Sequence, residues 1–568
     1  MDFHATLPLV PFEAAPGSQG SCEPADCLTA GVSPRFVRAA SMTSSKRCTG
    51  VRAAQVVVAI ASILVSGTIW YTFAGSRSSA GFEWVNHDVG NILYIGQHML
   101  RGERLYADLA EANPPGIFFV AELVAAVATW TGFSPIALFH GLVVLLGLSG
   151  VAQIQSLYAR ANRPVELILS CCAFLLILSG GGSIGDRSLA DSFGQREQLF
   201  ALVFVPYLLW RLSQQPLRKP EYLWSGLVGF FASLKPHFAL LVVAFELCCL
   251  PRGRATIRRV GPALVAGAVL PYALLPLHSP SSLAALWTET IPLHTRGAYA
   301  YFNQPYALFL HSTQHLWVLA YAAAIIYFLW SGAQPSRTLL LVLCVLPGLA
   351  YALVVQQHKF WDYHAIVLIA VLVVLAYLVG AKLVVRLPRE RSAPLFAILL
   401  GAAAVQNGFG LAELRIMSND WKNGLGVDAR LVKIAPLLAG RQRVLYYSTS
   451  IAHMRLALLL GHRSVGHWNH EILYPSLVRD PDPRRRARSL DRYCDEQRRF
   501  IAAEKPQAIV FHSARQGLTS AAEELFPLLV ERCHVVPQED YTRHAIAGIS
   551  EATVFLRRTD ERARDAKN

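Results

Sequence analysis

The chain has 568 residues, of which 53% are hydrophobic and only 16% are charged, and its formal net charge is +14. This composition excludes a large soluble protein. The positive charge does not indicate nucleic-acid binding, because the basic residues stand in short connectors between apolar runs, as in cytoplasmic loops that follow the positive-inside rule. Since no basic face with interleaved aromatic residues follows a recognisable module, we predict membrane lipid and no nucleic acid as a partner.

Residues 1–50 are rich in alanine, serine, proline and glycine, which predicts a disordered cytoplasmic tail. The first apolar run begins near residue 55. It starts too late and is too long for a cleavable signal peptide, so we expect it to remain as a membrane span.

Eleven apolar segments approach or reach the roughly 20 residues that cross a bilayer, and they contain almost no charges. They lie at about 53–74, 134–157, 164–183, 198–213, 222–235, 237–250, 260–278, 314–331, 338–356, 362–381 and 394–412. The sequence therefore predicts an all-α polytopic membrane domain over residues 51–414.

The basic connectors determine the predicted orientation. Segment 115–131 is also apolar, but as a span it would place the basic connector 159–164 and all later ones outside. We therefore expect 115–131 to lie along the outer membrane surface, with the amino terminus inside and the carboxy terminus outside. Lys235-Pro236-His237 joins two short spans, which predicts a hairpin that stops below the outer surface.

From about residue 415 the sequence becomes polar, and short strands and helices alternate. The predicted strands are Arg443–Ser448, Ala508–Phe511 and Thr553–Leu556, and the predicted helices are Arg485–Ala503 and Ala521–Arg532. This alternation predicts a small α/β accessory domain over residues 415–568 on the outer side. Its two cysteines, Cys494 and Cys533, are expected to form a disulfide because that compartment is oxidising.

Three polar outer loops are predicted to meet at one surface. The first lies within residues 75–133 and includes a helix at about 89–101 and a Pro-Pro turn. Carboxylates that face cations at the lipid–water boundary suit the transfer of a group from a phosphate-bearing lipid to a nucleophile. The candidate residues of the three loops are Glu83, His87, Asp88, Tyr94 and Asn113; Asp191 and Arg196; and His358, Lys359 and His364.

The first loop, the run from Tyr94 to Asp108 (Tyr-Ile-Gly-Gln-His-Met-Leu-Arg-Gly-Glu-Arg-Leu-Tyr-Ala-Asp), the Pro-Pro turn and the juxtamembrane helix resemble the GT-C glycosyltransferases. The branch most similar is that of the protein O-mannosyltransferases and aminoarabinose transferases. The resemblance covers about residues 50–260 and extends further by span count alone.

This resemblance implies a polyprenyl-phosphate sugar as donor, a glycan, lipid or protein as acceptor, and inversion at the anomeric carbon. It implies a multi-pass protein of a bacterial inner membrane with its active site on the periplasmic side. By the same resemblance Asp88 is the catalytic base or orienting carboxylate, and Asp191 assists. His87 is an alternative base because the pKa of histidine lies near neutrality.

The chain departs from the family pattern at two places. His87-Asp88 stands where members often have Asp-Glu, and Asn113 precedes the Pro-Pro turn where many have lysine. That lysine would neutralise the departing phosphate, so we expect Lys235, Arg196 or Lys359 to replace it. Glu83, Tyr94, Asn113, His358 and His364 are further candidates for substrate contacts. No histidine or cysteine ligand set predicts a metal site, although carboxylates alone are sufficient ligands for Mg²⁺ or Mn²⁺.

Each candidate also has a purely structural interpretation. Asp88 precedes an amphipathic helix, where aspartate is a favoured N-cap. Ser192 and Gln195 fit a capping box, in which case Asp191 merely precedes a span. Arg196 and Glu197 are interfacial anchors in this interpretation, and the cationic residues of the third loop contact lipid headgroups.

Two other functions compete with the enzyme. A transporter or flippase of a lipid-linked precursor would place ionisable groups near the bilayer midplane. Glu246 and Lys235 are the clear mid-span candidates for such groups, whereas the acids gather in the outer loops. A non-catalytic assembly scaffold is the third possibility, and it would tolerate neutralisation of the loop acids.

Overall fold

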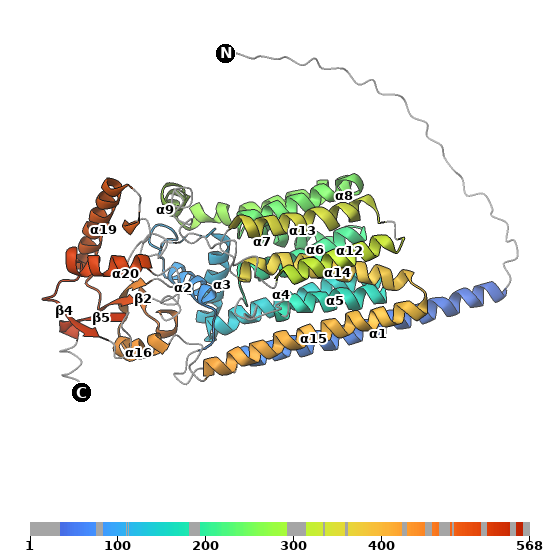
Figure 1. Cartoon of the computed structure of the whole chain (residues 1–568), viewed down its shortest axis with the longest axis horizontal. Coiled ribbons are helices and arrows are strands. Elements are labelled where there is room, and N and C mark those ends of the chain that lie inside the picture. The colour runs from blue at the N-terminus through green and yellow to red at the C-terminus, as the bar shows by residue number, and fades with distance from the viewer. Residues whose placement is uncertain are drawn as a thin grey trace, which may run out of the picture. The chain divides into compact units, whose positions relative to one another are not determined.

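Figure 1 shows the computed structural model of the chain. The structure describes residues 34–74, 83–109, 111, 113–180, 193–291, 314–332, 335–357, 362–422, 429–448, 457–464, 477–479, 482–512, 520–545 and 552–560. The chain divides into two compact units, Met1–Gly50 and Val51–Asn568. All the candidate site residues belong to the second unit.

Long apolar helices make up most of the second unit. They are α1 (Pro34–Ala74, of which Val51–Ala74 belongs to this unit), α4 (Pro135–Arg160), α5 (Pro164–Ser179), α6 (Arg196–Ser213), α7 (Lys219–Ala232), α8 (Pro236–His278), α12 (Gln314–Trp330), α13 (Arg337–Gln357), α14 (Ile366–Arg386) and α15 (Arg389–Lys422). Short helical segments, α9 (Pro280–Ala285) and η2 (Leu286–Thr290), follow α8, and η4 (Asp362–Ala365) precedes α14.

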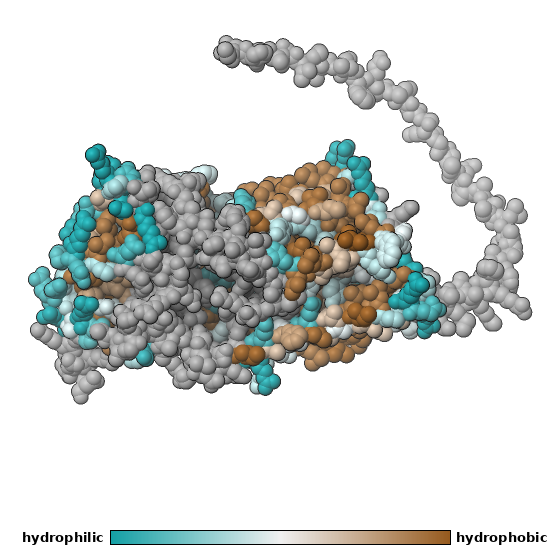
Figure 2. Space-filling view, in the orientation of Figure 1, coloured by the Kyte–Doolittle hydropathy of each residue, from teal (hydrophilic) through white to brown (hydrophobic). Residues whose placement is uncertain are grey.

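Six helical segments of the described chain are long and apolar enough to cross a membrane, and four shorter ones are also apolar. Figure 2 shows hydrophobic residues gathered on the surface of this helical part. Val56, Ile63 and Leu145 are more than half exposed there, as expected for side chains that face lipid. The protein is therefore a multi-pass membrane protein, and the number of eleven spans stays a prediction.

Helix α8 turns back along its length. A side chain at Gly116 would touch both Leu234, which precedes α8, and Pro271 within it. In a straight helix residues 236 and 271 would be about 50 Å apart. The chain must therefore reverse inside α8, in agreement with two separate apolar segments, Pro236–Pro251 and Arg254–His278, and with the predicted division into 237–250 and 260–278.

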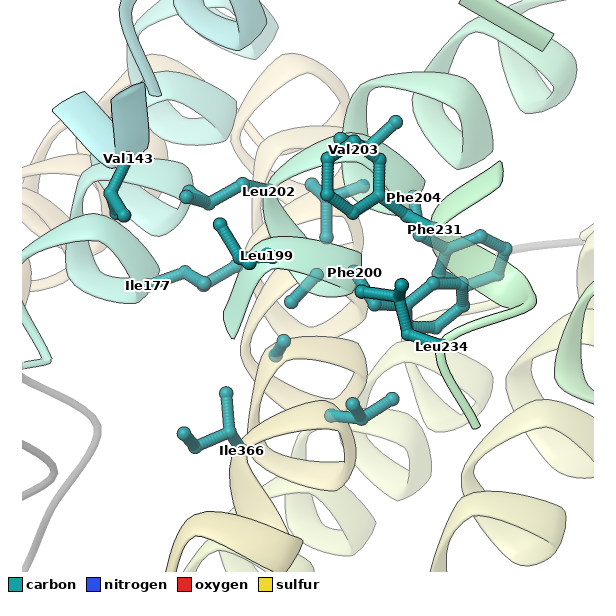
Figure 3. Packing of buried hydrophobic residues seen from close by; sticks show 14 of the residues in the cluster. Val143, Ile177, Leu199, Phe200, Leu202, Val203, Phe204, Phe231, Leu234 and Ile366 are labelled. Atoms are coloured by element: carbon teal, nitrogen blue, oxygen red, sulfur yellow. The ribbon is translucent and has the colours of Figure 1, made fainter. Parts of the chain in front are cut away.

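Helix α6 is the buried centre of the helical part. All its residues from Arg196 to Arg211 are buried, and it packs against α4, α5, α7, α8 and α14. Figure 3 shows this packing, in which Leu199, Phe200 and Leu202 of α6 are surrounded by Val143, Ile177, Phe231 and Ile366. Between neighbouring helices glycine permits close approach, since a Cβ at Gly229 of α7 would lie 2.0 Å from the Leu264 carbonyl oxygen of α8.

Two shorter helices lie at the end of the helical part where α6 begins. Helix α2 (His87–Leu100) confirms the helix predicted at 89–101, and it packs against α3 (Gly116–Thr131). The two backbones meet at Gly96, where a Cβ would come within 2.6 Å of Ala121. Helix α3 ends at Gly132 in the left-handed conformation, and Ser134 caps the following helix, α4.

The C-terminal part contains a five-stranded sheet with the order β2-β1-β3-β5-β4. Its strands are β1 (Arg443–Ser448), β2 (Arg463–Ser464), β3 (Ala508–His512), β4 (Tyr541–Ala545) and β5 (Ala552–Arg557). Strand β1 is parallel to β2 and β3, and β5 is antiparallel to β3 and β4. The three predicted strands are confirmed, whereas β2 and β4 were not predicted.

Helices cover this sheet, and alternate residues of β1 face different cores. Val444 and Tyr446 belong to the large core that includes α2, while Leu445 and Tyr447 belong to a second core. The predicted helices correspond to α19 (Pro483–Glu504) and to α20 (Ser520–Pro527) with η6 (Leu528–Arg532). A further helix, α16 (Ala429–Leu438), precedes the sheet.

The predicted disulfide is confirmed. Cys494 in α19 is bonded to Cys533, which follows η6, and the two Cα atoms are 5.7 Å apart. The bond ties together two helical elements on the same side of the sheet.

Candidate active site

Asp88 is not the N-cap of α2. The cap is Asn86, whose Oδ1 accepts hydrogen bonds from the backbone amides of Asp88 (2.8 Å) and Val89 (3.4 Å). The capping interpretation of Asp88 is therefore wrong, because Asp88 lies within the first helical turn. There the positive end of the helix dipole favours its negative charge.

The carboxylate of Asp88 instead contacts a residue that is distant in sequence. Gln195 Nε2 donates to Asp88 Oδ2 at 2.6 Å and to Asn86 Oδ1 at 2.9 Å. One amide group thus holds both the cap and the first-turn carboxylate of α2 at the start of α6.

Gln195 is itself the N-cap residue of α6, in an extended conformation and without a side-chain capping bond. A capping box with Ser192 as its cap would start the helix three residues earlier. That interpretation is wrong, since the helix begins at Arg196.

Two buried cations lie next to this contact. Lys235, the residue before α8, forms an ion pair with Glu197 Oε1, and its charge is within electrostatic range of Arg196 and Asp88. The guanidinium of Arg196 donates to Asn113 Oδ1. The structure therefore brings together four predicted site residues, Asp88, Arg196, Lys235 and Asn113.

A buried carboxylate fixes the loop that carries Asn113. Glu111, 2% exposed, accepts hydrogen bonds from the Asn113 backbone amide (3.0 Å), Asn113 Nδ2 (2.7 Å) and Asn91 Nδ2 (3.0 Å). Tyr106 donates its hydroxyl to the Asn113 carbonyl at 2.6 Å, and burial raises the pKa of Tyr106 well above its usual range. Asn113, which accepts the hydrogen bond from Arg196, is thus fixed by hydrogen bonds to Glu111 and Tyr106.

Three further predicted residues lie in the described part of the chain. Glu83 accepts a hydrogen bond from Ser134, the cap of α4. Tyr94 is buried on α2 with its ring centroid 4.2 Å from that of His98. His364 is buried in η4, just before α14. Their roles toward a substrate stay predictions.

The remaining predicted residues fall outside the description. Of His87 only the backbone is described, as the first residue of α2. Asp191, His358 and Lys359 lie outside the described residues. Their assignments as assisting acid, substrate contact and phosphate contact stay predictions.

Gln195 and Glu197 belong to the second polar outer loop of the sequence analysis, but neither was assigned a role toward a substrate. Glu197 was interpreted together with Arg196 as an interfacial anchor, but the two residues are only 1% and 5% exposed, so this interpretation is wrong. The available signal was the run Gln195-Arg196-Glu197 directly before a fully apolar segment, because such polar residues are buried only where they find partners.

No group of three or more His, Cys, Asp or Glu side chains in the described part of the chain could hold a metal ion. The ionisable groups proposed for a transporter are paired internally. Glu246 accepts from Arg211 Nε (2.8 Å), Arg211 Nη2 (2.6 Å) and the Tyr207 hydroxyl (2.7 Å), and Lys235 pairs with Glu197.

No family model and no curated protein match the chain. Among solved structures, ArnT from Cupriavidus metallidurans bound to undecaprenyl phosphate is similar at 15% identity, with a TM-score of 0.47. The apo form of the same protein is similar at 14% identity, with a TM-score of 0.48. In both cases the match covers 88% of this chain and 97% of the other.

Proposed function

We propose that the protein is an integral-membrane glycosyltransferase that moves a sugar from a polyprenyl-phosphate donor to an acceptor on the outer face of the membrane, with inversion. The observation that carries the proposal is the position of Asp88. Its carboxylate does not cap the helix, accepts a hydrogen bond from Gln195, and lies close enough to Lys235 for the two charges to interact.

The chemistry requires these groups. In the reaction the bond between the anomeric carbon and the phosphate oxygen breaks, and the acceptor oxygen forms a new bond to that carbon. The phosphate keeps the electron pair, so cations such as Arg196 and Lys235 stabilise the charge that develops on it. Asp88 receives the proton that the acceptor loses, since a carboxylate can act as general base in such displacements.

The outer, periplasmic side of a bacterial inner membrane is the proposed location of the site. The disulfide between Cys494 and Cys533 supports an oxidising environment for the C-terminal part, which we propose to be an accessory domain. The basic connectors support the same orientation. The donor sugar is a hexose or pentose, and the acceptor a glycan, lipid or protein.

The test is a transfer assay with purified protein and a panel of radiolabelled polyprenyl-phosphate sugars, scored for release or transfer of sugar. Asp88→Asn should lose the activity, while Asp108→Asn should retain it. Asp108 is a carboxylate of the same outer loop that pairs with Arg104. Failure of the folded protein to use any member of the panel would overturn the proposal, and nuclear magnetic resonance of the product reports inversion.

A further inference from the structure

Two buried acceptor oxygens at the start of α6 have no hydrogen-bond partner within the described structure. They are Gln195 Oε1 and Glu197 Oε2, and their residues are 0% and 1% exposed. Buried acceptors normally receive a hydrogen bond, because an unsatisfied one loses the water it had in the unfolded chain. Two of them on either side of Arg196 therefore call for an explanation.

The other polar atom of each side chain is already engaged. Gln195 Nε2 donates to Asp88 and Asn86, so the orientation of this amide is fixed. A flipped amide would turn its oxygen toward two other oxygens. Glu197 Oε1 is bound by Lys235. What remains free at both residues is an acceptor, and its missing partner must be a hydrogen-bond donor.

The proposed substrate has three parts, and only one of them can donate. A prenyl chain has no polar hydrogen. An ionised phosphodiester has acceptor oxygens only, and its charge suits Arg196 and Lys235. The sugar carries hydroxyl groups, which are donors, and it lies between the phosphate and the acceptor's proton, that is, between these cations and Asp88.

We propose that Gln195 Oε1 and Glu197 Oε2 accept hydrogen bonds from hydroxyl groups of the donor sugar. This inference rests on the proposed function and assigns a separate role to each of the residues around the start of α6. Asp88 receives the acceptor's proton, Arg196 and Lys235 bind the phosphate, and Gln195 and Glu197 recognise the sugar. Donors whose sugar lacks the contacted hydroxyl groups are therefore poor substrates.

The experiment measures the dissociation constants of lipid ligands with and without a sugar, for the wild-type protein and its variants. The ligands are a polyprenyl phosphate without sugar and the same lipid phosphate carrying the sugar accepted in the transfer screen, with its monodeoxy analogues. The bare lipid phosphate reports any effect on phosphate binding, including release of Lys235. The ratio of the two dissociation constants then isolates the contribution of the sugar.

The ratio is the dissociation constant of the sugar-bearing lipid divided by that of the bare lipid phosphate. For Glu197→Met we expect this ratio to rise at least about tenfold, as for loss of a hydrogen bond to a charged group. At least one deoxy analogue should lose affinity in wild type but not in Glu197→Met. Gln195→Met should show the same pattern with another analogue. Glu221→Gln is the matched control, because Glu221 is a buried carboxylate paired with Arg160 outside this site, and its ratio should equal that of wild type.

If Glu197→Met does not fold, Lys235→Met/Glu197→Met removes both charges of the pair and permits the same comparison. The inference is overturned if the folded variants have the wild-type ratio and each deoxy analogue loses the same affinity in every protein. In that case transfer by the wild-type protein still supports the proposed function. A wild-type protein that binds and transfers none of the lipid-linked sugars fails the proposed function itself.

Discussion

Replacement of Asp88 by asparagine separates a catalytic role from a structural one. Asn86 caps α2 and is untouched by the change. The Gln195 amide, which donates to Asp88 Oδ2, can donate in the same way to the carbonyl oxygen of an asparagine. What the variant removes is the negative charge and with it the capacity to accept a proton.

The expected cost in stability is small. Loss of a charge from the first turn of a helix weakens its interaction with the helix dipole by about 0.3–1 kcal/mol. The expected loss of activity is much larger, because general-base assistance contributes at least about a hundredfold to a rate. Asp88→Asn should therefore unfold close to the wild-type temperature and transfer sugar at least about a hundred times more slowly.

The assay is single-turnover transfer from the accepted lipid donor, measured beside thermal unfolding of the same preparation. Asn86→Ala is the opposite control, since it removes the cap at a cost of about 1 kcal/mol but keeps the negative charge of Asp88 and its capacity to accept a proton. Near-normal transfer by folded Asp88→Asn would refute the role of Asp88 and make His87 or Asp191 the next residue to test.

Four other measurements probe separate parts of the protein. Lys235→Met alone should lower stability by about 3–5 kcal/mol because it leaves Glu197 buried without its cation; thermal unfolding checks this, and wild-type stability would contradict the pairing. A reporter fused after the last residue should be active outside the cytoplasm, and activity in the cytoplasm alone would overturn the topology. Burial lowers the pKa of His462 to about 4, so the folded state resists its protonation and stability should fall by up to about 3 kcal/mol as the pH drops from 6.5 to about 4; a His462→Gln variant with the same pH dependence would refute this. Arg463→Gln removes an ion pair with Glu103 near the end of α2. It should lower the turnover of the wild-type protein by a larger factor than that of Asp88→Asn, whereas equal factors would indicate a general loss of stability.

The sequence predicts those elements whose signal is local. Strand β1 (Arg443–Ser448) is a run of apolar and aromatic residues and was predicted with its bounds. Strand β2 has only two residues, and β4 (Tyr541–Ala545) lacks apolar alternation, so neither carries a pattern strong enough to identify. Both strands exist because a neighbouring strand offers hydrogen bonds, which is a property of the sheet.

The site shows the same division. Asn86 and Asp88 are both favourable N-cap residues, so the sequence could not decide which one caps the helix. Only the contact with Gln195, 107 residues away in the chain, shows that the Asp88 carboxylate has another partner. The pair of Glu197 with Lys235 joins residues 38 positions apart, one in α6 and one just before α8, and no local pattern encodes it.

Strand β2 of the C-terminal sheet makes an ion pair near the end of the helix that carries Asp88. At the start of α2, Asn86 and Gln195 fix the first turn. At its end, His98 Nδ1 lies 2.9 Å from Glu103 Oε1, and the same oxygen lies 2.9 Å from Arg463 Nε of β2. In the proposed mechanism the general base acts only within hydrogen-bonding distance of the proton it accepts. We therefore predict that the contact from β2, more than 350 residues further along the chain, affects the position of the Asp88 carboxylate.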